Sequence, residues 1–252
     1  MNQLQDKFLT LIEDLSKEVS KSFKINRTDK EQICSMAIYA TIIENSTACA
    51  YLMNRATLSS MPILIRANFE ALIDLKNSID NDKYHKKLHS TFLKQKRNFL
   101  KSKIQRGHKE VGSKSDEFKE NEKKYIQIKE EVKRYKQNGY EPLKVIEKFN
   151  LIDSLEDYET TYAGFSLETH NDLSVLEKKH IVHDDEGIPN VVIFKERNTL
   201  DKELFLSSSI GTLRLATEEM SAFLGIHDKK EIMKLLSRFK KLESDVKDIV
   251  KS

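Results

Sequence analysis

The sequence has few of the residues that make tight turns, cross-links or membrane spans. Its 252 residues include only seven glycines and three prolines, so a fold made mostly of strands and tight hairpins is excluded. Cys34 and Cys49 are too few for a disulfide framework; we expect two buried thiols, with a disulfide or metal pair as the alternative. No run approaches about 18 apolar residues, and the acidic start does not resemble a secretory signal. We therefore expect a cytoplasmic protein without a membrane partner.

Charged residues are abundant, and the apolar residues are arranged with a helical period. Charged residues make up 33% of the chain and hydrophobic residues 38%, which is still enough for a sizeable core. Lys, Glu, Leu and Ile favour helix, and apolar positions recur three and four residues apart. The sequence therefore predicts an all-α fold: a helical bundle with a projecting basic helical hairpin and one small β-hairpin.

Capping and stop residues place the expected helices. Thr28 and Glu31 have the spacing of a capping box, and Pro62 fits a first helical turn. Gly139 and Gly225 are expected helix stops. We expect helices over about 2–23, 28–55, 61–78, 142–149, 154–170 and 201–224 and from about 228 onward.

Residues 82–139 differ from the rest of the chain in charge and in apolar pattern. They hold 18 basic and 8 acidic residues. Leu88, Phe92 and Phe99 mark a thin stripe on a first helix, and a second helix carries a similar stripe. Narrow stripes predict an antiparallel helical hairpin. We therefore expect one helical core domain, 1–81 with 140–252, and an inserted charged hairpin.

The basic excess of this hairpin has two interpretations. Ten Lys or Arg lie within 83–109 without a single acid, and such a helix is often only a solvated surface. The alternative is a site for RNA or DNA, because clustered cations displace counterions from phosphates. Tyr84, Phe92 and Phe99 would stack bases if the hairpin seam leaves them exposed. The candidate nucleic-acid-binding residues are Lys94, Lys96, Arg97, Lys101 and Lys103.

One segment has the pattern of paired strands. His180–His183 and Val191–Phe194 flank the turn residues Asp184–Gly187, which predicts a small β-hairpin. His180 and His183 are three residues apart, so on a strand they point to opposite faces, and we expect no metal site. The chain has no phosphate loop and no familiar catalytic motif, and we expect no cofactor.

Arg66 and Glu70 are charged residues within an apolar helical segment. Their spacing of four places them on one helix face, and Asp74 extends that face by a turn. Charge inside an apolar helix is costly unless it is paired. The two interpretations are an ion pair at the edge of the core and a buried pair that orients a functional site.

Tyr162, Ser166 and His170 repeat the same four-residue spacing on a later helix. They are either three surface residues or part of a site in which His170 acts as a general acid or base, since its ordinary pKa is near neutrality. Tyr162 and Ser166 would then donate hydrogen bonds to substrate.

These two motifs give the chain a family resemblance. The segments 64–75 and 162–170, LIRANFEALIDL and YAGFSLETH, resemble a bacterial helical family catalogued as domain of unknown function five-six-seven-seven, and the likeness covers about residues 30–225. The resemblance implies an Arg-x-x-x-Glu helix that meets a Tyr-x-x-x-Ser-x-x-x-His helix across the bundle. Some members look like parts of bacterial defence or mobile-element loci.

The resemblance leaves two functional hypotheses open. One is an interaction or sensor module, associated with defence or stress, in which the polar residues form a structural or ligand-recognition network. The other is a metal-independent ribonuclease-like effector, because the helical build is similar to that of HEPN ribonucleases. Their signature, an Arg followed four to six residues later by His, is absent, so Arg66 and His170 would have to form a split site. A protein partner or homo-oligomer is compatible with both.

Overall fold

The computed structural model describes residues 2–53, 60–110, 116–169, 173–193 and 198–251, and these are mostly helical with one small β-hairpin, as predicted. No helix among them is long and apolar enough to cross a membrane. The elements are α1 (Asn2–Ser22), α2 (Lys30–Leu52), α3 (Met61–Asp80), α4 (Tyr84–Glu110), α5 (Asp116–Gln137), α6 (Val145–Asn150), α7 (Leu155–Asp157), a π-helical turn (Tyr158–Tyr162), α8 (Ala163–Thr169), α9 (Leu173–His180), β1 (Ile181–His183), β2 (Pro189–Val191), α10 (Thr199–Phe223) and α11 (Lys230–Lys251).

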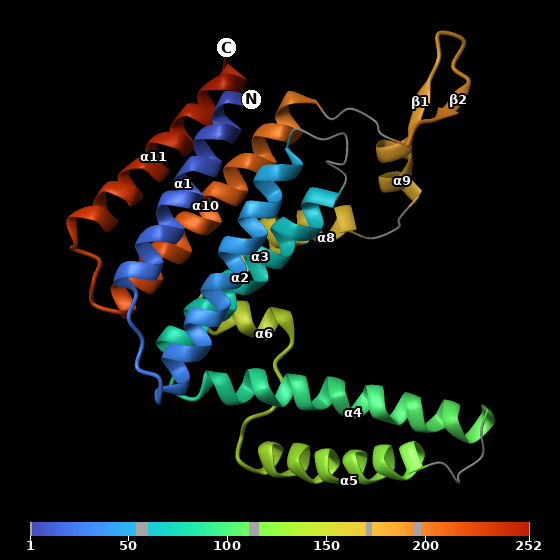
Figure 1. The fold of residues 1–252 in the computed structure, drawn as a ribbon. Coiled ribbons are helices and arrows are strands. Elements are labelled where there is room, and N and C mark those ends of the chain that lie inside the picture. Colours follow the sequence, from blue (N-terminus) through green and yellow to red (C-terminus); the bar gives the residue numbers. More distant parts are fainter. Residues whose placement is uncertain (1, 54–59, 111–115, 170–172, 194–197, 252) are drawn as a thin grey trace. The chain divides into compact units, whose positions relative to one another are not determined.

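The chain divides into two compact units, residues 1–80 with 148–252, and residues 81–147. In the larger unit α2, α3 and α10 pack against one another, α11 packs on α10 and α1, and α1 also contacts α2 (Figure 1). One hydrophobic cluster fills the space between these helices. Its fully buried side chains include Phe8, Leu15, Tyr39, Ile42, Met61, Ile65, Leu75, Leu206, Ile210 and Phe239.

The start of α2 corrects the predicted capping box. The N-cap is Asp29, whose side chain accepts hydrogen bonds from the backbone N–H groups of Glu31 and Gln32. Thr28 instead donates its hydroxyl to the side chain of Asn26. A carboxylate satisfies the free N–H groups of a first turn and interacts favourably with the helix dipole, so Asp29 serves as a better cap than its neighbour.

Both cysteines are free thiols, as the first interpretation of the sequence had it, but only one is fully buried. Cys49 lies in the core, and burial raises the pKa of its thiol to about 12. Cys34 is half-buried, and burial raises its pKa as well. A thiol with a raised pKa is a poor nucleophile, so neither cysteine is suited to covalent chemistry.

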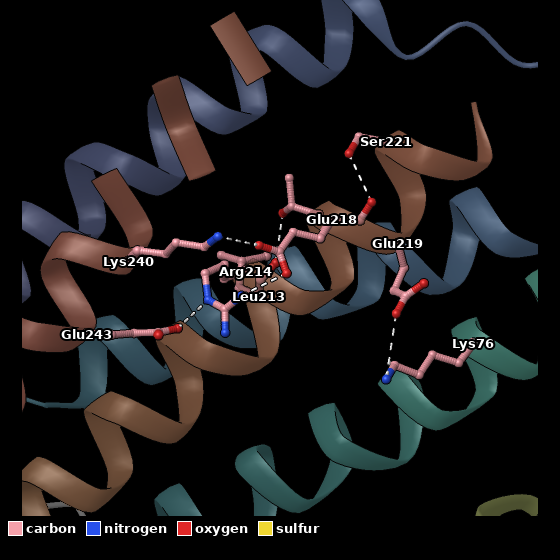
Figure 2. A network of polar contacts seen from close by, with 9 residues as sticks. Lys76, Leu213, Arg214, Glu218, Glu219, Ser221, Lys240 and Glu243 are labelled. Atoms are coloured by element: carbon pink, nitrogen blue, oxygen red, sulfur yellow. Dashed lines mark hydrogen bonds and ion pairs between the residues drawn. The ribbon is translucent and has the colours of Figure 1, made fainter. Parts of the chain in front are cut away.

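Ion pairs fasten the outer helices to the core. Arg214 of α10 donates to Glu243 of α11 at 2.8 Å and to Glu218, one turn along α10, at 2.7 Å (Figure 2). Lys240 reaches Glu218 from α11 at 3.5 Å. The Arg214 side chain is only 18% exposed, so its carboxylate partners offset the cost of burying its charge.

The smaller unit is an antiparallel pair of helices, α4 and α5 (Figure 1). Its seam is filled by Leu93 and Leu100 of α4 against Ile128 of α5, with Tyr125, Val132 and Tyr135 packed around them. The predicted stripe of Leu88, Phe92 and Phe99 is therefore wrong. Phe92 and Phe99 lie at the surface because the neighbouring pair, with the same spacing of seven, faces α5.

Two short elements lie a few residues from their predicted places. The second strand is Pro189–Val191 rather than Val191–Phe194, because the Asp184 side chain accepts the N–H groups of Glu186 and Ile188 and closes the turn early. Phe194 is outside the described residues. The helix expected over 142–149 begins at Val145, because the Glu147 side chain accepts the Lys144 N–H at the start of the helix.

The inserted-domain prediction has a direct test. Replacing residues 84–136 by a short linker should leave a protein that melts in one cooperative transition, because the cluster in the larger unit contains no residue from 81–147. Circular dichroism melting measures this. Deletion of α10 is the control and should abolish the transition, since its buried side chains lie in that cluster. A non-cooperative product from the first deletion would contradict the insertion.

Candidate functional site

Arg66 and Glu70 form the ion pair that their spacing predicts. The Arg66 Nε lies 3.1 Å from Glu70 Oε1, one turn along α3. The two side chains are 29% and 34% exposed, so the pair lies at the edge of the core and not inside it. Isolated pairs in this setting contribute little to stability, and the importance of this one depends on its further partners.

The Tyr162 hydroxyl is the centre of the site. It donates to Glu70 Oε1 at 2.8 Å and accepts hydrogen bonds from Arg66 Nε at 3.2 Å and Nη2 at 2.9 Å. The guanidinium carbon also lies 5.1 Å from the centre of the tyrosine ring, a cation–π distance. The motifs on α3 and on the later helix therefore meet through Arg66, Glu70 and Tyr162.

Thr169 is a fourth member that the sequence interpretation missed. Arg66 Nη1 donates to Thr169 Oγ1 at 2.9 Å, and that hydroxyl donates to the backbone oxygen of Ser166 at 2.7 Å. Thr169 follows Tyr162 by seven residues, which places both on one face of a helix. That spacing was visible in the sequence and would have found it.

Of the remaining two predicted residues, Ser166 takes part only through its backbone oxygen. Among the described residues, the Ser166 hydroxyl is buried without a hydrogen-bond partner. His170 lies outside the described residues. Three of the five predicted residues, Arg66, Glu70 and Tyr162, are thus brought together.

An aromatic cluster holds Tyr162 in place. Phe149 is fully buried, with its ring 5.4 Å from that of Tyr162 and 5.3 Å from that of Tyr158. It also stacks on Phe69 of α3, with the ring centres 6.4 Å apart. The π-helical turn stacks Tyr158 on Tyr162 at 5.3 Å, so both rings face Phe149. The site thus rests on a packed apolar support.

Asp74 continues the polar face of α3 into a second contact. It binds Lys148 at 2.8 Å, and both side chains are mostly buried. Asn77 donates to the backbone oxygen of Lys148 at 3.0 Å. These contacts fix Phe149, which follows Lys148 directly, against α3.

The electrostatics keep the tyrosine neutral and the arginine charged. Burial raises the pKa of Tyr162, and the Glu70 carboxylate raises it further, whereas Arg66 lowers it. Burial lowers the pKa of Arg66, but Tyr162 and Glu70 outweigh it and leave that pKa above its ordinary value. Tyr162 therefore keeps its proton, and the group is suited to holding α8 on α3 rather than to moving protons.

The five basic residues predicted to bind nucleic acid do not share a face of α4. Lys96 and Lys103 lie on the side that carries Phe92 and Phe99, while Lys94 and Lys101 lie on the opposite side, with Arg97 between them. Lys103 also pairs with Glu117 of α5 at 2.7 Å. Charge alone therefore gives α4 no single binding surface. Within the described ranges, no group of His, Cys, Asp or Glu is arranged to hold a metal ion.

Fold and site together define a class. It is a helical bundle in which an Arg–Glu pair on one helix contacts a tyrosine from another, and the sequence between the two motifs forms a charged helical hairpin. The chain belongs to a family of unknown function, DUF5677, whose model matches residues 32–188. The resemblance drawn from the two sequence motifs is thereby confirmed. Comparison with curated proteins and with solved structures finds no match.

Proposed function

We propose that this chain is a helical interaction and sensor module, associated with bacterial defence or stress, that binds a small, largely apolar ligand beside α8. The observation that carries this proposal is a recess of about 320 Å³ lined by residues of the π-helical turn, α8, α9 and α10. Phe165 and Phe205 are buried side chains that line it, and Leu204 stands partly exposed beside them. Small-molecule sites have volumes of this order and a mostly apolar lining.

A few polar groups of the recess would orient such a ligand. Glu168 of α8 pairs with Lys178 of α9 at 3.0 Å, and Thr160 and Thr161 add hydroxyl groups. Residues 161, 164, 165 and 168 lie on one face of the helix, and Tyr162 and Thr169 lie on another. In this proposal the Arg66 contacts are a clamp: they fix one face of α8 on α3 so that the adjacent face keeps the shape of the recess.

Filling the recess tests the proposal. Gly164→Leu should abolish cellular activity in a phage-protection or toxicity assay, because the new side chain occupies the ligand volume. A Cβ at this position would meet no atom within 4 Å, so the side chain starts in open space, and losing a helical glycine favours helix by up to about 1 kcal/mol. The melting temperature should therefore be unchanged or higher.

Gly164→Ala is the matched control. It brings the same gain in helix propensity but adds only a methyl group, so cellular activity should persist. Full activity of Gly164→Leu, at a melting temperature equal to or above that of the wild type, would reject the recess as the functional site.

The second candidate is a metal-independent ribonuclease-like effector acting on RNA. It is favoured by the Tyr162 hydroxyl between the charged groups of Arg66 and Glu70, and by the unbonded Ser166 hydroxyl four residues along. Arg66 would steady a phosphate and His170 would move the proton. This candidate expects the wild type to cleave labelled RNA in the presence of EDTA, and His170→Ala to stop cleavage. The sensor proposal expects no cleavage by either protein.

A further inference from the structure

Two large aromatic side chains on α4 are exposed and lie outside the apolar seam of the hairpin. Phe92 is 51% exposed and Phe99 66%, while Leu93 and Leu100 fill the seam of the hairpin. The hairpin therefore forms without either ring. Exposed apolar groups that the fold does not need are typical of binding surfaces when they are arranged together.

The two rings are arranged together, and cations alternate with them. Residues 92, 96, 99, 103 and 106 follow one another at spacings of three and four, so they form one line along α4. The rings lie about 10 Å apart along the helix axis. Lys96 Nζ stands 5.6 Å from the centre of the Phe92 ring. Phe99, Lys103 and Arg106 line a surface hollow of about 390 Å³ together with Asn98 and Ser102.

The charge of this line is positive and largely unopposed. Residues 83–109 contain no acid, so every charge contributed by α4 itself along the line is a cation. Lys103 is the exception, because it forms an ion pair with Glu117 of α5. Within the described part of the chain, Lys96 and Arg106 form no ion pair with an acid, which leaves both to bind an external anion.

We propose that this face of α4 binds single-stranded nucleic acid, with bases stacked on Phe92 and Phe99 and phosphates held by Lys96 and Arg106. Aromatic rings interleaved with cations are the usual platform for single strands, because every base offers a ring face and every nucleotide a phosphate. A duplex hides its base faces within its own stack, so it would meet only the cations. An acidic protein would pair with the cations but has no equivalent need for two separated rings. This surface shares no residue with the α8 recess, so it would be a second binding function.

The test measures binding of the full chain to fluorescein-labelled oligonucleotides of about 15 nucleotides, in the size range of known single-strand sites, by fluorescence anisotropy. Oligo-dT, oligo-rU and a duplex of the same length form the three arms. Phe92→Ala with Phe99→Ala should weaken single-strand binding by about 5- to 150-fold for each ring and leave duplex binding unchanged. Comparison of the dT and rU arms identifies which sugar the surface prefers. Ile126→Ala, which removes an exposed apolar side chain of α5, is the control and should change nothing.

Two charge-matched double variants separate this line from basic charge in general. Lys96→Gln with Arg106→Gln should weaken binding. It should also make the negative slope of log affinity against log salt shallower by about 1.4, the value for two phosphate contacts on a single strand. Lys94→Gln with Lys101→Gln removes the same charge from the opposite face and should change the slope much less. Both pairs spare the Lys103–Glu117 contact, so all variants should melt like the wild type.

Three results would overturn the proposal. In the first, the wild type does not bind single strands even at low salt. In the second, the Lys96/Arg106 and Lys94/Lys101 double variants lose equal affinity. In the third, the phenylalanine variant binds single strands as the wild type does. Binding of a polyglutamate peptide that depends on both rings would assign the surface to an acidic protein instead. None of these results bears on the α8 recess, whose test uses Gly164.

Discussion

Replacing Phe149 by alanine should lower the free energy of unfolding by about 3–5 kcal/mol, the cost of removing a fully buried phenylalanine. The ring is completely buried and contacts Phe69, Tyr158 and Tyr162. None of these neighbours can fill the space without leaving the others, so a cavity remains. Urea denaturation followed by circular dichroism measures the change.

Phe92→Ala is the matched control because it removes the same ring from an exposed position on α4. Its free energy of unfolding should lie within about 0.5 kcal/mol of that of the wild type, as is usual for surface substitutions. Phe149→Ala should also bring the pKa of Tyr162 back toward its ordinary value, since burial is the main cause of its increase. A Phe149→Ala protein as stable as Phe92→Ala would show that the aromatic cluster does not support the site.

The helices with one wide apolar stripe were predictable from the sequence. Leu4, Phe8, Leu11 and Leu15 recur at spacings of three and four, and all four are buried where α1 meets its neighbours. Helix ends with a special backbone requirement were predictable too. Gly139 and Gly225 have the positive φ values of 77° and 64° expected of residues that stop a helix, because other side chains rarely adopt that conformation.

The seam of the hairpin could not be predicted, for a physical reason. Phe92 and Phe99 are seven residues apart, and so are Leu93 and Leu100 beside them. Each pair makes an equally regular stripe, so periodicity cannot choose between them. Only the position of Ile128 and its neighbours on α5 decides which pair is buried. The exposed phenylalanines are thus a feature that the structure alone reveals.

At the site, local spacing was predictable and long-range partners were not. The Arg66–Glu70 pair follows from a spacing of four on one helix. The Asp74–Lys148 pair joins residues 74 positions apart, and no local pattern indicates it. The π-helical turn over Tyr158–Tyr162 was missed for a related reason, because its extra residue per turn has no signature in composition.

Arg66→Ala should lower the free energy of unfolding by about 1–3 kcal/mol, because it leaves Glu70, Tyr162 and Thr169 without their shared donor. The value should lie toward the lower end, since about a third of the Arg66 and Glu70 side chains is exposed and water can replace part of the loss. Lys124→Ala is the control. It breaks an ion pair with Glu120 of the same spacing on the surface of α5 and should leave the melting temperature unchanged.

The pH dependence of stability tests whether the Tyr162 hydroxyl is the centre of the clamp. The pKa of Tyr162 is raised in the folded protein, so its contribution to stability is complete below the unfolded value of about 10 and is lost as the pH rises through the folded value. The free energy of unfolding of Tyr162→Phe should therefore differ from that of the wild type by a constant amount below about pH 10, and the difference should shrink above that pH.

The pKa of Tyr162 should also respond to changes at Arg66. In Arg66→Ala it should rise further, because Arg66 lowers it and Glu70 remains. Arg66→Lys keeps the charge but cannot reach Glu70, Tyr162 and Thr169 together, so it should restore the pKa more fully than the stability. If the pKa of Tyr162 is the same in the wild type, Arg66→Ala and Arg66→Lys, Arg66 does not contact the hydroxyl in solution.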